Sequence, residues 1–346
     1  MNLTYRTKRR LQRAGLIGAT VLLLLILIGF CWVIWLERYV VYTRDGATLN
    51  FDVVDLPGAG QLAMPPSADE TVPIYVNEGL DAIDLNKELT QISGYYIDTE
   101  TLQTDVAGAR DIVATVPSNT AIMLEVKTIW GQFNYSSNVS NATISSRVDV
   151  TQVDSLITDI TSRNLYAVAV VPAFRDRYFF LANNRNTSLG LAIKGKGYLW
   201  QDNDSCYWFD PTDNNTIVWL EEIVRELKAL GFDEVVFSEF RIPKTENIVF
   251  DGDKTNAIQK VAQTLVTACA TDSFAVSFMT SESSFPRPDG RSRLFMQDVG
   301  PKNVDAVAAM VDMENPQAGL VFMCNTNDTR YDAYSVMRPV AMAIAN

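Results

Sequence analysis

GFDEVVFSEFRIP, residues 231–243, is the stretch that decides the fold class of this chain. The preceding residues 217–230 place their leucines, isoleucines and valines at helical spacing, and the glycine that follows suits the end of a helix. Residues 235–240 then form a short, mostly apolar segment of strand length. A helix followed by a strand that is apolar on both faces is the repeating unit of a parallel α/β sheet. In barrels of this kind the active site lies at the carboxyl ends of the strands, where this strand carries Glu239 and Arg241.

Further apolar segments alternate with helical patterns over most of the chain. Strands are predicted at residues 92–97, 121–127, 165–171, 234–240, 274–279 and 320–324. Helices are predicted at residues 99–116, 150–163, 214–230, 254–269, 302–311 and 333–345. Such alternation predicts a parallel sheet with right-handed crossovers. Because eight units close a barrel, we expect an α/β fold, an incomplete TIM-like (β/α) barrel of about six units. The open edge is expected to be covered by residues 73–79, by the terminal helix, or by a second copy of the chain in a homo-oligomer.

The N-terminal region carries a membrane signal. Residues 14–36 are an uncharged apolar run, long enough to span a bilayer as a helix, which takes roughly 20 residues. Five basic residues precede this run, so the positive-inside rule places residues 1–13 in the cytoplasm and the rest of the chain outside. We therefore predict an uncleaved, single-pass signal anchor in the cell membrane with an extracellular C-terminal domain. A cleaved signal peptide is the alternative, but its apolar region usually spans only ~7–15 residues and a small-x-small site follows it.

Residues 37–73 are predicted to connect the anchor to the domain. Residues 39–43 and 48–53 flank an Asp-Gly pair, which predicts a small hairpin, with an extended stalk as the alternative. Prolines and glycines then mark a linker that ends near residue 73. The β/α domain is therefore expected over residues 74–346.

Composition excludes several classes of function. The formal net charge is −12, and without the five basic residues of the N-terminal tip 24 basic residues remain against 41 acidic ones, a net charge of −17. This charge argues against nucleic acid as a partner. The chain contains no histidine, which removes Ser-His-Asp and Cys-His catalysis and His-ligated zinc, so that carboxylates must carry any acid–base chemistry.

No cofactor or metal is predicted, because the aspartate pairs at 202–204 and 251–253 do not fit the EF-hand spacing. Cysteine also adds little. Beyond the apolar run there are only Cys206, Cys269 and Cys324, so at most one disulfide can form, and Cys206 with Cys324 is the expected pair.

Several charged residues are predicted at the carboxyl ends of strands. Glu125 and Lys127 are two residues apart at the end of the second strand, so alternation places both on one face. Asp176 follows the third strand and Glu282 the fifth. Converging carboxylates of this kind suit a glycosidase, which needs two carboxyl groups ~5–9.5 Å apart. The alternative for Glu125 and Lys127 is a structural ion pair inside the barrel mouth.

Four stretches in register carry a resemblance to a known family. They are residues 121–131 (AIMLEVKTIWG), 165–176 (LYAVAVVPAFRD), 208–211 (WFDP) and 231–243. Together they resemble the bacterial "putative glycosyl hydrolase" domain of the TIM-barrel glycosidase superfamily over roughly residues 90–340. The resemblance implies a glycan site at the barrel mouth, and many members are anchored to the membrane or secreted by Gram-positive bacteria. Residues that match the pattern are Glu125 (conservatively), Lys127, Phe174, Asp176, Trp208, Asp210 and Arg241.

The fourth strand departs from the family pattern F-D-Y-x-R-F-P. Ser238 occupies the place of the aspartate, and Glu239 comes one residue later. One residue flips the face of a strand, so Glu239 is expected to point away from where that aspartate would point unless a bulge intervenes. In many barrel glycosidases of the superfamily the acid/base comes from the fourth strand and the nucleophile from the seventh. The resemblance therefore implies that this chain has altered the first and lacks the second.

Two interpretations remain open. In a hydrolase, Glu239 or Glu125 would be the general acid and Asp176 or Glu282 its partner, with Lys127 and Arg241 orienting the sugar. In a degenerate glycosidase-like domain, the mouth would bind cell-envelope polysaccharide without cleaving it, or the barrel would be a non-enzymatic structural or interaction module.

Aromatic side chains cluster in the long segment after the third strand. Tyr198, Trp200, Tyr207 and Trp208 can stack on sugar rings or cover the top of the barrel. Trp208, Asp210 and Glu282 complete the predicted substrate-binding set. The other long loop, residues 131–147, is predicted to be flexible and polar, and it carries glycosylation sequons at Asn134, Asn138 and Asn141.

Overall fold

The structure is a computed structural model that describes residues 40–43, 46–49, 89–183, 188–282, 284–285, 287–311 and 313–344. The chain divides into two compact units, Met1–Ile74 and Tyr75–Asn346. In the first unit, β1 (Val40–Thr43) pairs with β2 (Gly46–Leu49) in an antiparallel hairpin, so Gly46 belongs to a strand and not to the turn. The predicted cytoplasmic tip, anchor and linker lie outside the described residues. Among the helices that the structure describes, none has the length and hydropathy to cross a bilayer.

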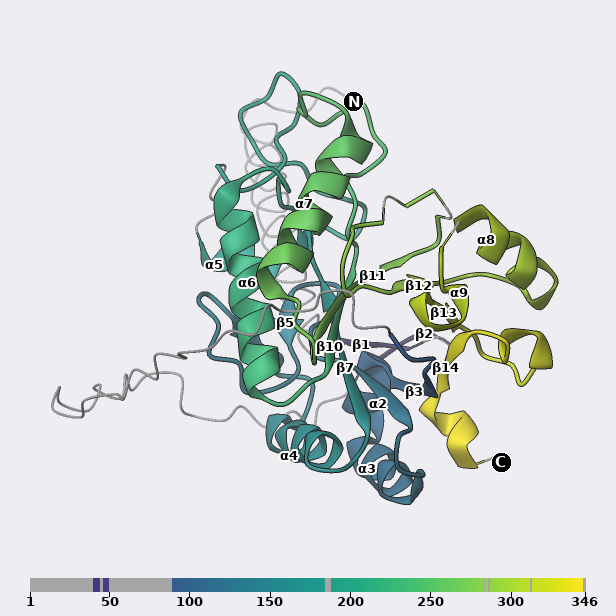
Figure 1. Cartoon of the computed structure of the whole chain (residues 1–346). Helices are drawn as coiled ribbons and strands as arrows, with labels where there is room; N and C mark the ends of the chain where they lie inside the picture. The colour runs from purple at the N-terminus through teal and green to yellow at the C-terminus, as the bar shows by residue number, and fades with distance from the viewer. Residues whose placement is uncertain are drawn as a thin grey trace, which may run out of the picture. The chain divides into compact units, whose positions relative to one another are not determined.

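The second unit is a closed barrel of eight parallel strands (Figure 1). In barrel order the strands are β3 (Ser93–Ile97), β4 (Ala121–Glu125), β7 (Tyr166–Pro172), β10 (Glu234–Ser238), β11 (Ala275–Thr280), β12 (Leu294–Met296), β13 (Leu320–Met323) and β14 (Ser335–Pro339). The six predicted strands are confirmed, but the expectation of an incomplete barrel is wrong. Pairing of β14 with β3 closes the ring, so no open edge remains in the barrel for a segment or a second copy to cover.

The two additional strands show why the prediction fell short. β12 has only three residues, too few to reveal a period of two. The stretch predicted as the terminal helix is β14 followed by the 3₁₀ helix η4 (Val340–Ile344). Pro339 would have stood inside that helix, where its ring clashes with the preceding turn. η4 lies beside β3 and α3, at the point where the barrel closes.

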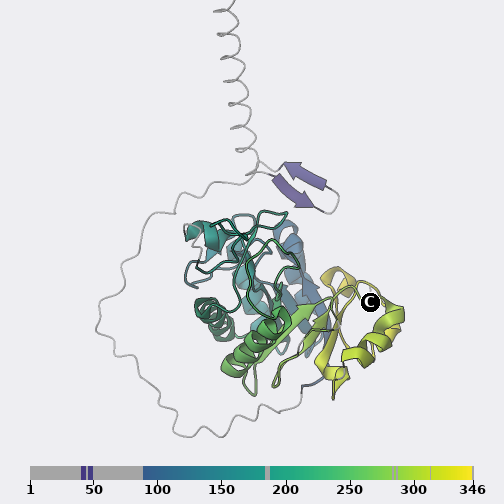
Figure 2. The same ribbon diagram turned by 90° about the horizontal axis from the view of Figure 1, so that it is seen from above.

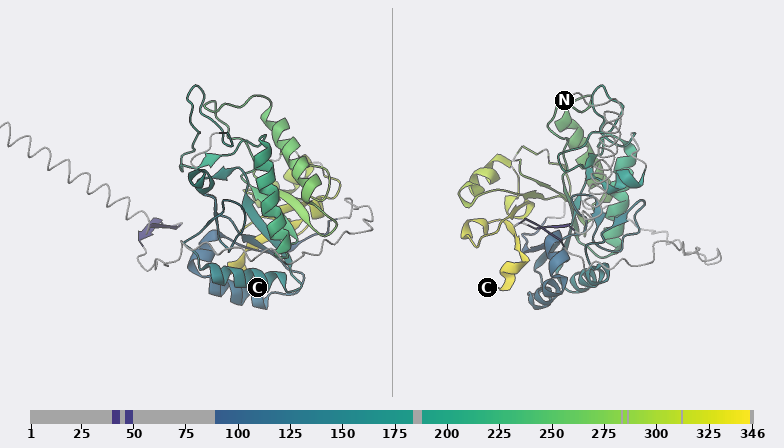
Figure 3. Two further views of the ribbon diagram at one scale, coloured as in Figure 1. Left: turned by 90° about the vertical axis from the view of Figure 1, so that its left-hand side faces the viewer. Right: turned by 180° about the vertical axis from the view of Figure 1, so that it is seen from behind.

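Helices surround the barrel on most sides. They are α2 (Thr99–Thr104), α3 (Val106–Thr115), α4 (Val150–Thr161), α5 (Tyr178–Ala182), α6 (Asn214–Ala229), α7 (Lys254–Cys269), η2 (Pro301–Asn303), α8 (Val304–Val311), α9 (Pro316–Gly319) and η3 (Thr329–Tyr331). α6 and α7 lie side by side on one flank, and α8 and α9 lie on the opposite flank (Figures 1 and 2). Two short ladders, β5 (Gln132–Phe133) with β6 (Thr143–Ile144) and β8 (Arg175–Asp176) with β9 (Tyr207–Trp208), form in the loops that follow β4 and β7. Figure 3 shows the domain from two further directions, with α6 and α7 again side by side.

Aspartates begin five of the α-helices. Each accepts a hydrogen bond from a backbone N–H of the first turn, which satisfies a donor that has no partner within the helix. The five are Asp98, Asp105, Asp149, Asp213 and Asp253. Asp105 also ends α2, so the single helix predicted over residues 99–116 is two helices. Some of the excess of acidic over basic residues is therefore explained by aspartates that cap helices.

Two separate cores set the direction of the strand residues. Met123, Val168, Val170 and Val236 belong to the core inside the barrel, and their outward neighbours pack against the helices. Side chains alternate along a strand, so Glu125 and Ser238, each two residues beyond an inward residue, also face the lumen.

An ion pair occupies the opposite, N-terminal end of the lumen. Arg293 and Glu234 meet at 2.6 Å with both side chains fully buried, and the Tyr166 hydroxyl donates to Glu234 at 3.0 Å. Arg293 also donates to the Ala318 and Thr90 carbonyls. This end of a barrel contributes to stability, not to function, so these charges are not a candidate site.

Candidate functional site

Glu125 is the carboxylate that the structure places inside the barrel mouth. It ends β4 on the inward face, and its Oε2 accepts a hydrogen bond from the backbone N–H of Thr99 at 2.8 Å. Burial raises the pKa of Glu125, and the Thr99 hydrogen bonds and the nearby Asp98 charge modify that shift. A half-buried carboxyl group with a raised pKa holds its proton at higher pH than an exposed one, which suits a hydrogen-bond or proton donor to a sugar.

Asn134 helps to position Glu125, a role that the residue pattern does not predict. Its side-chain amide is fully buried and donates to the Glu125 carbonyl at 2.8 Å and to the Thr99 hydroxyl at 3.1 Å. Asn134 thus joins the end of β4 to the residue whose N–H holds the Glu125 carboxylate.

Hydrogen bonds to α6 hold the loop at residues 131–147 in place, which corrects the prediction of a flexible segment. Glu226 of α6 accepts hydrogen bonds from the Tyr135 hydroxyl at 2.6 Å and from the Asn138 backbone N–H. Glu222 accepts from the backbone N–H of Ser140 at 2.8 Å. The carboxylates of α6 therefore fix the loop that carries Asn134.

Lys127 does not share the mouth with Glu125. The strand ends at Glu125, and beyond it the chain turns so that Lys127 points outward, with its Nζ 4.6 Å from the centre of the Trp219 ring on α6. Its ion-pair partner is Asp176, at 2.8 Å from Nζ to Oδ2, and both side chains are 0% exposed. The predicted common face of Glu125 and Lys127 is therefore corrected, because the alternation on which it depended stops two residues earlier.

Asp176 is enclosed on all sides. Its Oδ1 accepts a hydrogen bond from the Phe179 backbone N–H at 2.7 Å, which holds the first turn of α5. A Cβ at Gly131 would meet that same oxygen at 1.9 Å, so the loop backbone lies directly against the carboxylate. Lys127 and Asp176 therefore hold these loops together, and neither side chain is exposed.

The end of β10 decides whether the usual acid is present. Ser238 lies on the inward face, level with Pro172 of β7, and Glu239 follows with a φ of 49°. Without that left-handed residue, alternation would send Phe240 into the lumen. Instead Phe240 packs in the outer layer, its ring centre 6.0 Å from that of Phe237. The kink at Glu239 therefore places this carboxylate on the rim of the barrel.

A chain of contacts links Glu239 to the long loop after β7. Arg241 pairs with Glu239 at 3.0 Å and lies over the Trp208 ring, 4.7 Å from its centre. Trp208 is only 2% exposed, and its Nε1 donates to Asp202 at 3.1 Å. Trp208 therefore serves as a support for Arg241 and offers little ring surface to a sugar.

Arg175 binds the aspartate pair at residues 202–204. Its guanidinium contacts the carboxylates of Asp202 and Asp204 at 2.6 Å each. Burial acts to raise the pKa of Asp202, but hydrogen bonds from Arg175, the Cys206 backbone and Trp208 hold it below its ordinary value. An arginine thus fills the place that a cation would need.

The sequence profile of a family described as "Putative glycosyl hydrolase domain" matches residues 94–277, more than half of the chain. The chain belongs to this family. No curated protein matches the chain significantly. The matched residues span β3 to the start of β11, so the family region includes Glu125, Ser238 and Glu239.

Several solved structures are similar in fold to this glycosyl hydrolase domain. A hypothetical protein from Ruminiclostridium thermocellum is 21% identical, with a TM-score of 0.45 over 54% of this chain and 96% of that chain. A GH36 alpha-galactosidase from Geobacillus stearothermophilus is 8% identical, with a TM-score of 0.50 over 75% of this chain and 40% of that chain. A GH20 exo-beta-N-acetylglucosaminidase from Vibrio harveyi is 6% identical, with a TM-score of 0.46 over 67% and 41%. This chain spans about two fifths of the length of these two glycosidases, and the likeness concerns the fold alone.

The remaining predicted residues of this glycosyl hydrolase domain lie apart from Glu125. Asp210 binds the backbone N–H and hydroxyl of Thr212 ahead of α6, a local turn. Glu282, after β11, pairs with the exposed Lys244 at 2.7 Å. Asp298, two residues after β12, is an exposed carboxylate with a φ of 60° that the sequence analysis missed, because β12 itself was missed.

The seventh strand, β13, brings no carboxylate to the mouth. It ends at Met323 and continues into Cys324 and Asn325, and the next acid, Asp328, caps η3 and pairs with Arg330. Cys324 is a free thiol, as are Cys206 and Cys269, so the expected disulfide does not form. A barrel glycosidase that draws its nucleophile from the seventh strand has no counterpart here.

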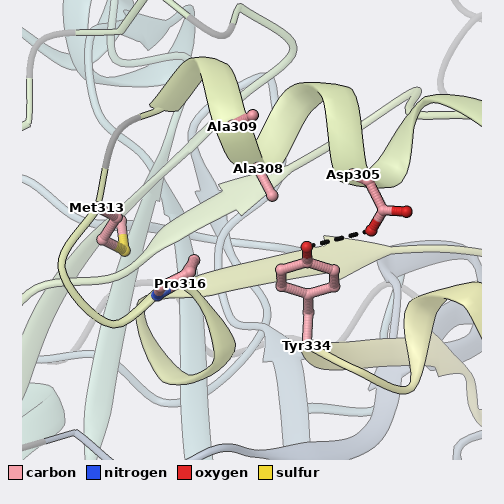
Figure 4. Close-up of a pocket in the computed structure, with 6 residues that line it drawn as sticks. All are labelled: Asp305, Ala308, Ala309, Met313, Pro316 and Tyr334. Carbon is pink, nitrogen blue, oxygen red and sulfur yellow. Dashed lines mark hydrogen bonds between the residues drawn. The ribbon is translucent and has the colours of Figure 1, made fainter.

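Two recesses are lined by described residues of the barrel and its helices. One, of about 330 Å³, lies on the outer flank between α8 and the residues that precede β13 and β14 (Figure 4). Its Tyr334 hydroxyl donates to Asp305 at 3.2 Å. The other, of about 210 Å³, lies between α2, α3 and η4.

Proposed function

We propose that this glycosyl hydrolase domain binds polysaccharide at the C-terminal mouth of its barrel and does not cleave it. The observation that carries the proposal is the residue at the inward end of the fourth strand, which is Ser238 where the family pattern has aspartate. A retaining or inverting mechanism needs two carboxyl groups facing one sugar. Of Glu125, Asp176 and Glu239, only Glu125 faces the lumen at the mouth, since Glu239 lies on the rim with Arg241 and Asp176 is buried.

The mouth keeps the groups that hold a sugar. Glu125 and Ser238 are half-buried polar residues on the inner face, and Tyr96 is an inward, partly exposed aromatic ring on β3. Polar groups that converge on an apolar floor fix the orientation of a ligand, and an aromatic ring covers the apolar face of a sugar. Met279 and Met323 supply part of that floor.

The proposed setting is the outer face of a bacterial cell membrane. Residues 14–36, with basic residues before them, support a single-pass anchor that leaves the barrel extracellular, and the Pro/Gly-rich linker would give the barrel reach. Cell-envelope polysaccharide is then the glycan within reach. No nucleic acid, cofactor or metal enters this proposal.

The test uses the full chain in neutral detergent. Binding to envelope polysaccharides is measured by affinity electrophoresis, and reducing-end release is measured in parallel. We expect binding that Glu125→Ala weakens, with no release above background. Lack of binding to every glycan would favour the alternative, a non-enzymatic structural or interaction module.

A second candidate function, hydrolysis, is favoured by one observation. Glu239 has a left-handed backbone, a conformation that costs a non-glycine residue roughly 1–2 kcal/mol and that gathers at functional sites. If Glu239 acts with Glu125, the unaltered chain releases reducing ends, and Glu239→Gln abolishes release while circular dichroism stays unchanged. That result would replace the binding proposal.

A further inference from the structure

A short, basic, aromatic turn projects from the long loop after β7. Residues 194–198 read Lys-Gly-Lys-Gly-Tyr, and all five are exposed, with Tyr198 at 66%. A Cβ added at Gly195 or Gly197 would meet no atom within 4 Å, so the turn is surrounded by open space. We call residues 194–198 the basic tip.

The basic tip has a defined backbone. Ala192 and Leu199 form an antiparallel bridge, and the Ile193 N–H donates to the Tyr198 carbonyl at 2.8 Å. A second bridge joins Ile193 to Ile248, in the loop that follows β10. The basic tip, which is part of the loop after β7, therefore also contacts the loop after β10.

Contacts connect the basic tip to the rim of the barrel. Leu199 is buried beneath it, and Trp200 comes next, with its ring centre 6.5 Å from that of Trp208. Trp208 lies under Arg241, which pairs with Glu239 at the end of the fourth strand. A polysaccharide that extends from the mouth along this side would reach the tip.

The lysines of the basic tip differ from others above the barrel. Lys127 pairs with Asp176, Lys244 pairs with Glu282, and Lys254 donates to two backbone carbonyls. Lys194 and Lys196 have no carboxylate within 4.0 Å in the described part of the chain. Their charge is unneutralised in a protein with a net charge of −12, and beyond about 8–10 Å the acidic surface is screened by salt.

We propose that the basic tip recognises an anionic group on the bound polysaccharide, a carboxylate or a phosphate. The ammonium groups of Lys194 and Lys196 pair with the anion, and the exposed Tyr198 ring covers the neighbouring sugar. This inference rests on the proposed function and makes it narrower, since it selects acidic polymers from among envelope glycans.

The experiment compares acidic and neutral polymers of similar length on the full chain in neutral detergent. The probes are polygalacturonate for carboxylate, poly(glycerol phosphate) for phosphate, and amylose as the neutral polymer. The variants are Lys194→Gln/Lys196→Gln, Tyr198→Ala, and the matched control Lys260→Gln/Lys302→Gln, which removes two exposed lysines elsewhere. We expect the tip double variant to lose about 3- to 30-fold in affinity for an acidic polymer, the range of two exposed ion pairs.

The loss of affinity in the control variant should be less than half of the loss in the tip double variant. Raising the salt concentration from about 0.05 to about 0.5 M should remove the preference for acidic polymers. Tyr198→Ala should weaken binding several-fold at either salt. The polymer that shows the larger loss identifies the anion as carboxylate or phosphate.

Binding of amylose as tight as that of both acidic polymers would overturn this inference and leave the proposed function standing. Equal losses in the tip and control variants would also overturn it, and so would binding of anionic phospholipid vesicles without binding of any acidic polymer. If none of the three polymers binds, the proposed function fails and this inference fails with it.

Discussion

Lys127 and Asp176 form a fully buried ion pair, 2.8 Å from Nζ to Oδ2, between the barrel and α6. Two residues that match the family motif therefore act in packing and not in the mouth. Lys127 also donates to the Pro172 carbonyl at 3.2 Å, so it holds the end of β7. The pair orders the carboxyl ends of two adjacent strands and of the loops that follow them.

Breaking this pair should destabilise the barrel strongly. Asp176→Asn keeps the shape of the side chain but leaves the Lys127 charge buried without a counterion, a change that costs about 3–5 kcal/mol. Glu282→Gln breaks the exposed pair with Lys244 and should cost less than about 1 kcal/mol. Urea unfolding of both variants, followed by circular dichroism, measures the difference. Equal stability of Asp176→Asn and the unaltered chain would show that the pair is not structural.

Gly131 should tolerate no side chain. Its φ is 102°, and a Cβ would meet the Asp176 carboxylate at 1.9 Å. Gly252 has a similar φ of 118° but open space around it, so Gly252→Ala reports the backbone strain alone, about 1 kcal/mol. Gly131→Ala must in addition displace a buried carboxylate, and we expect it to lower the free energy of unfolding by at least about 2 kcal/mol more. Matching losses in the two variants would mean that the loop moves aside freely.

Much of the barrel could be predicted from periodicity. Six strands and the helices near residues 150–163, 214–230 and 254–269 stand out because their apolar residues recur at a fixed spacing. β12 and β14 could not be found in this way. One is too short to show a period, and the other carries a small serine inward and a proline at its end. Closure of the barrel depends on all eight strands together, so the spacing of apolar residues within single segments cannot predict it.

Some features of the candidate site could likewise be predicted from the sequence, and others could not. The inward direction of Glu125 and Ser238 follows from counting residues along a strand. The outward turn of Lys127 and the left-handed φ of Glu239 do not, because each depends on where a strand stops. Asn134 joins β4 to α2 through tertiary hydrogen bonds, so only the folded chain reveals its role.

The Glu125 carboxyl group should make stability depend on pH. Burial raises its pKa in the folded state, so the folded protein binds this proton more tightly than the unfolded chain. Its contribution is fully present below the ordinary Glu pKa of about 4.3 and is lost as pH rises through the raised value. Glu125→Gln cannot ionise, so its unfolding free energy should rise relative to the unaltered chain over that interval and then stay level.

Urea unfolding at a series of pH values measures this difference. Glu246→Gln, which removes an exposed carboxylate from the loop after β10, is the matched control. The same pH dependence in both variants would contradict a special environment for Glu125.

Ser238→Asp should introduce the missing carboxylate. Val236 and Glu125 both pair with Val170, so position 238 lies one inward step above Glu125 and two strands away. With ~4.8 Å between strands and ~3.3 Å per residue, their Cα atoms are roughly 12 Å apart. Side chains that extend toward each other from these points bring two carboxyl groups into the ~5–9.5 Å range of glycosidases.

We expect the Ser238→Asp chain to release reducing ends from the polysaccharide that the unaltered chain binds, at a rate about 100-fold or more above background. Ser238→Asn, which has the same shape but no charge, should show no release, and adding Glu125→Gln to Ser238→Asp should abolish it. Binding is measured on each variant so that a loss of affinity is not mistaken for a loss of chemistry. If Ser238→Asp binds polysaccharide normally and releases nothing, then the missing element lies elsewhere, and the end of β13 at Met323, with no carboxylate beside it, becomes the next position to alter.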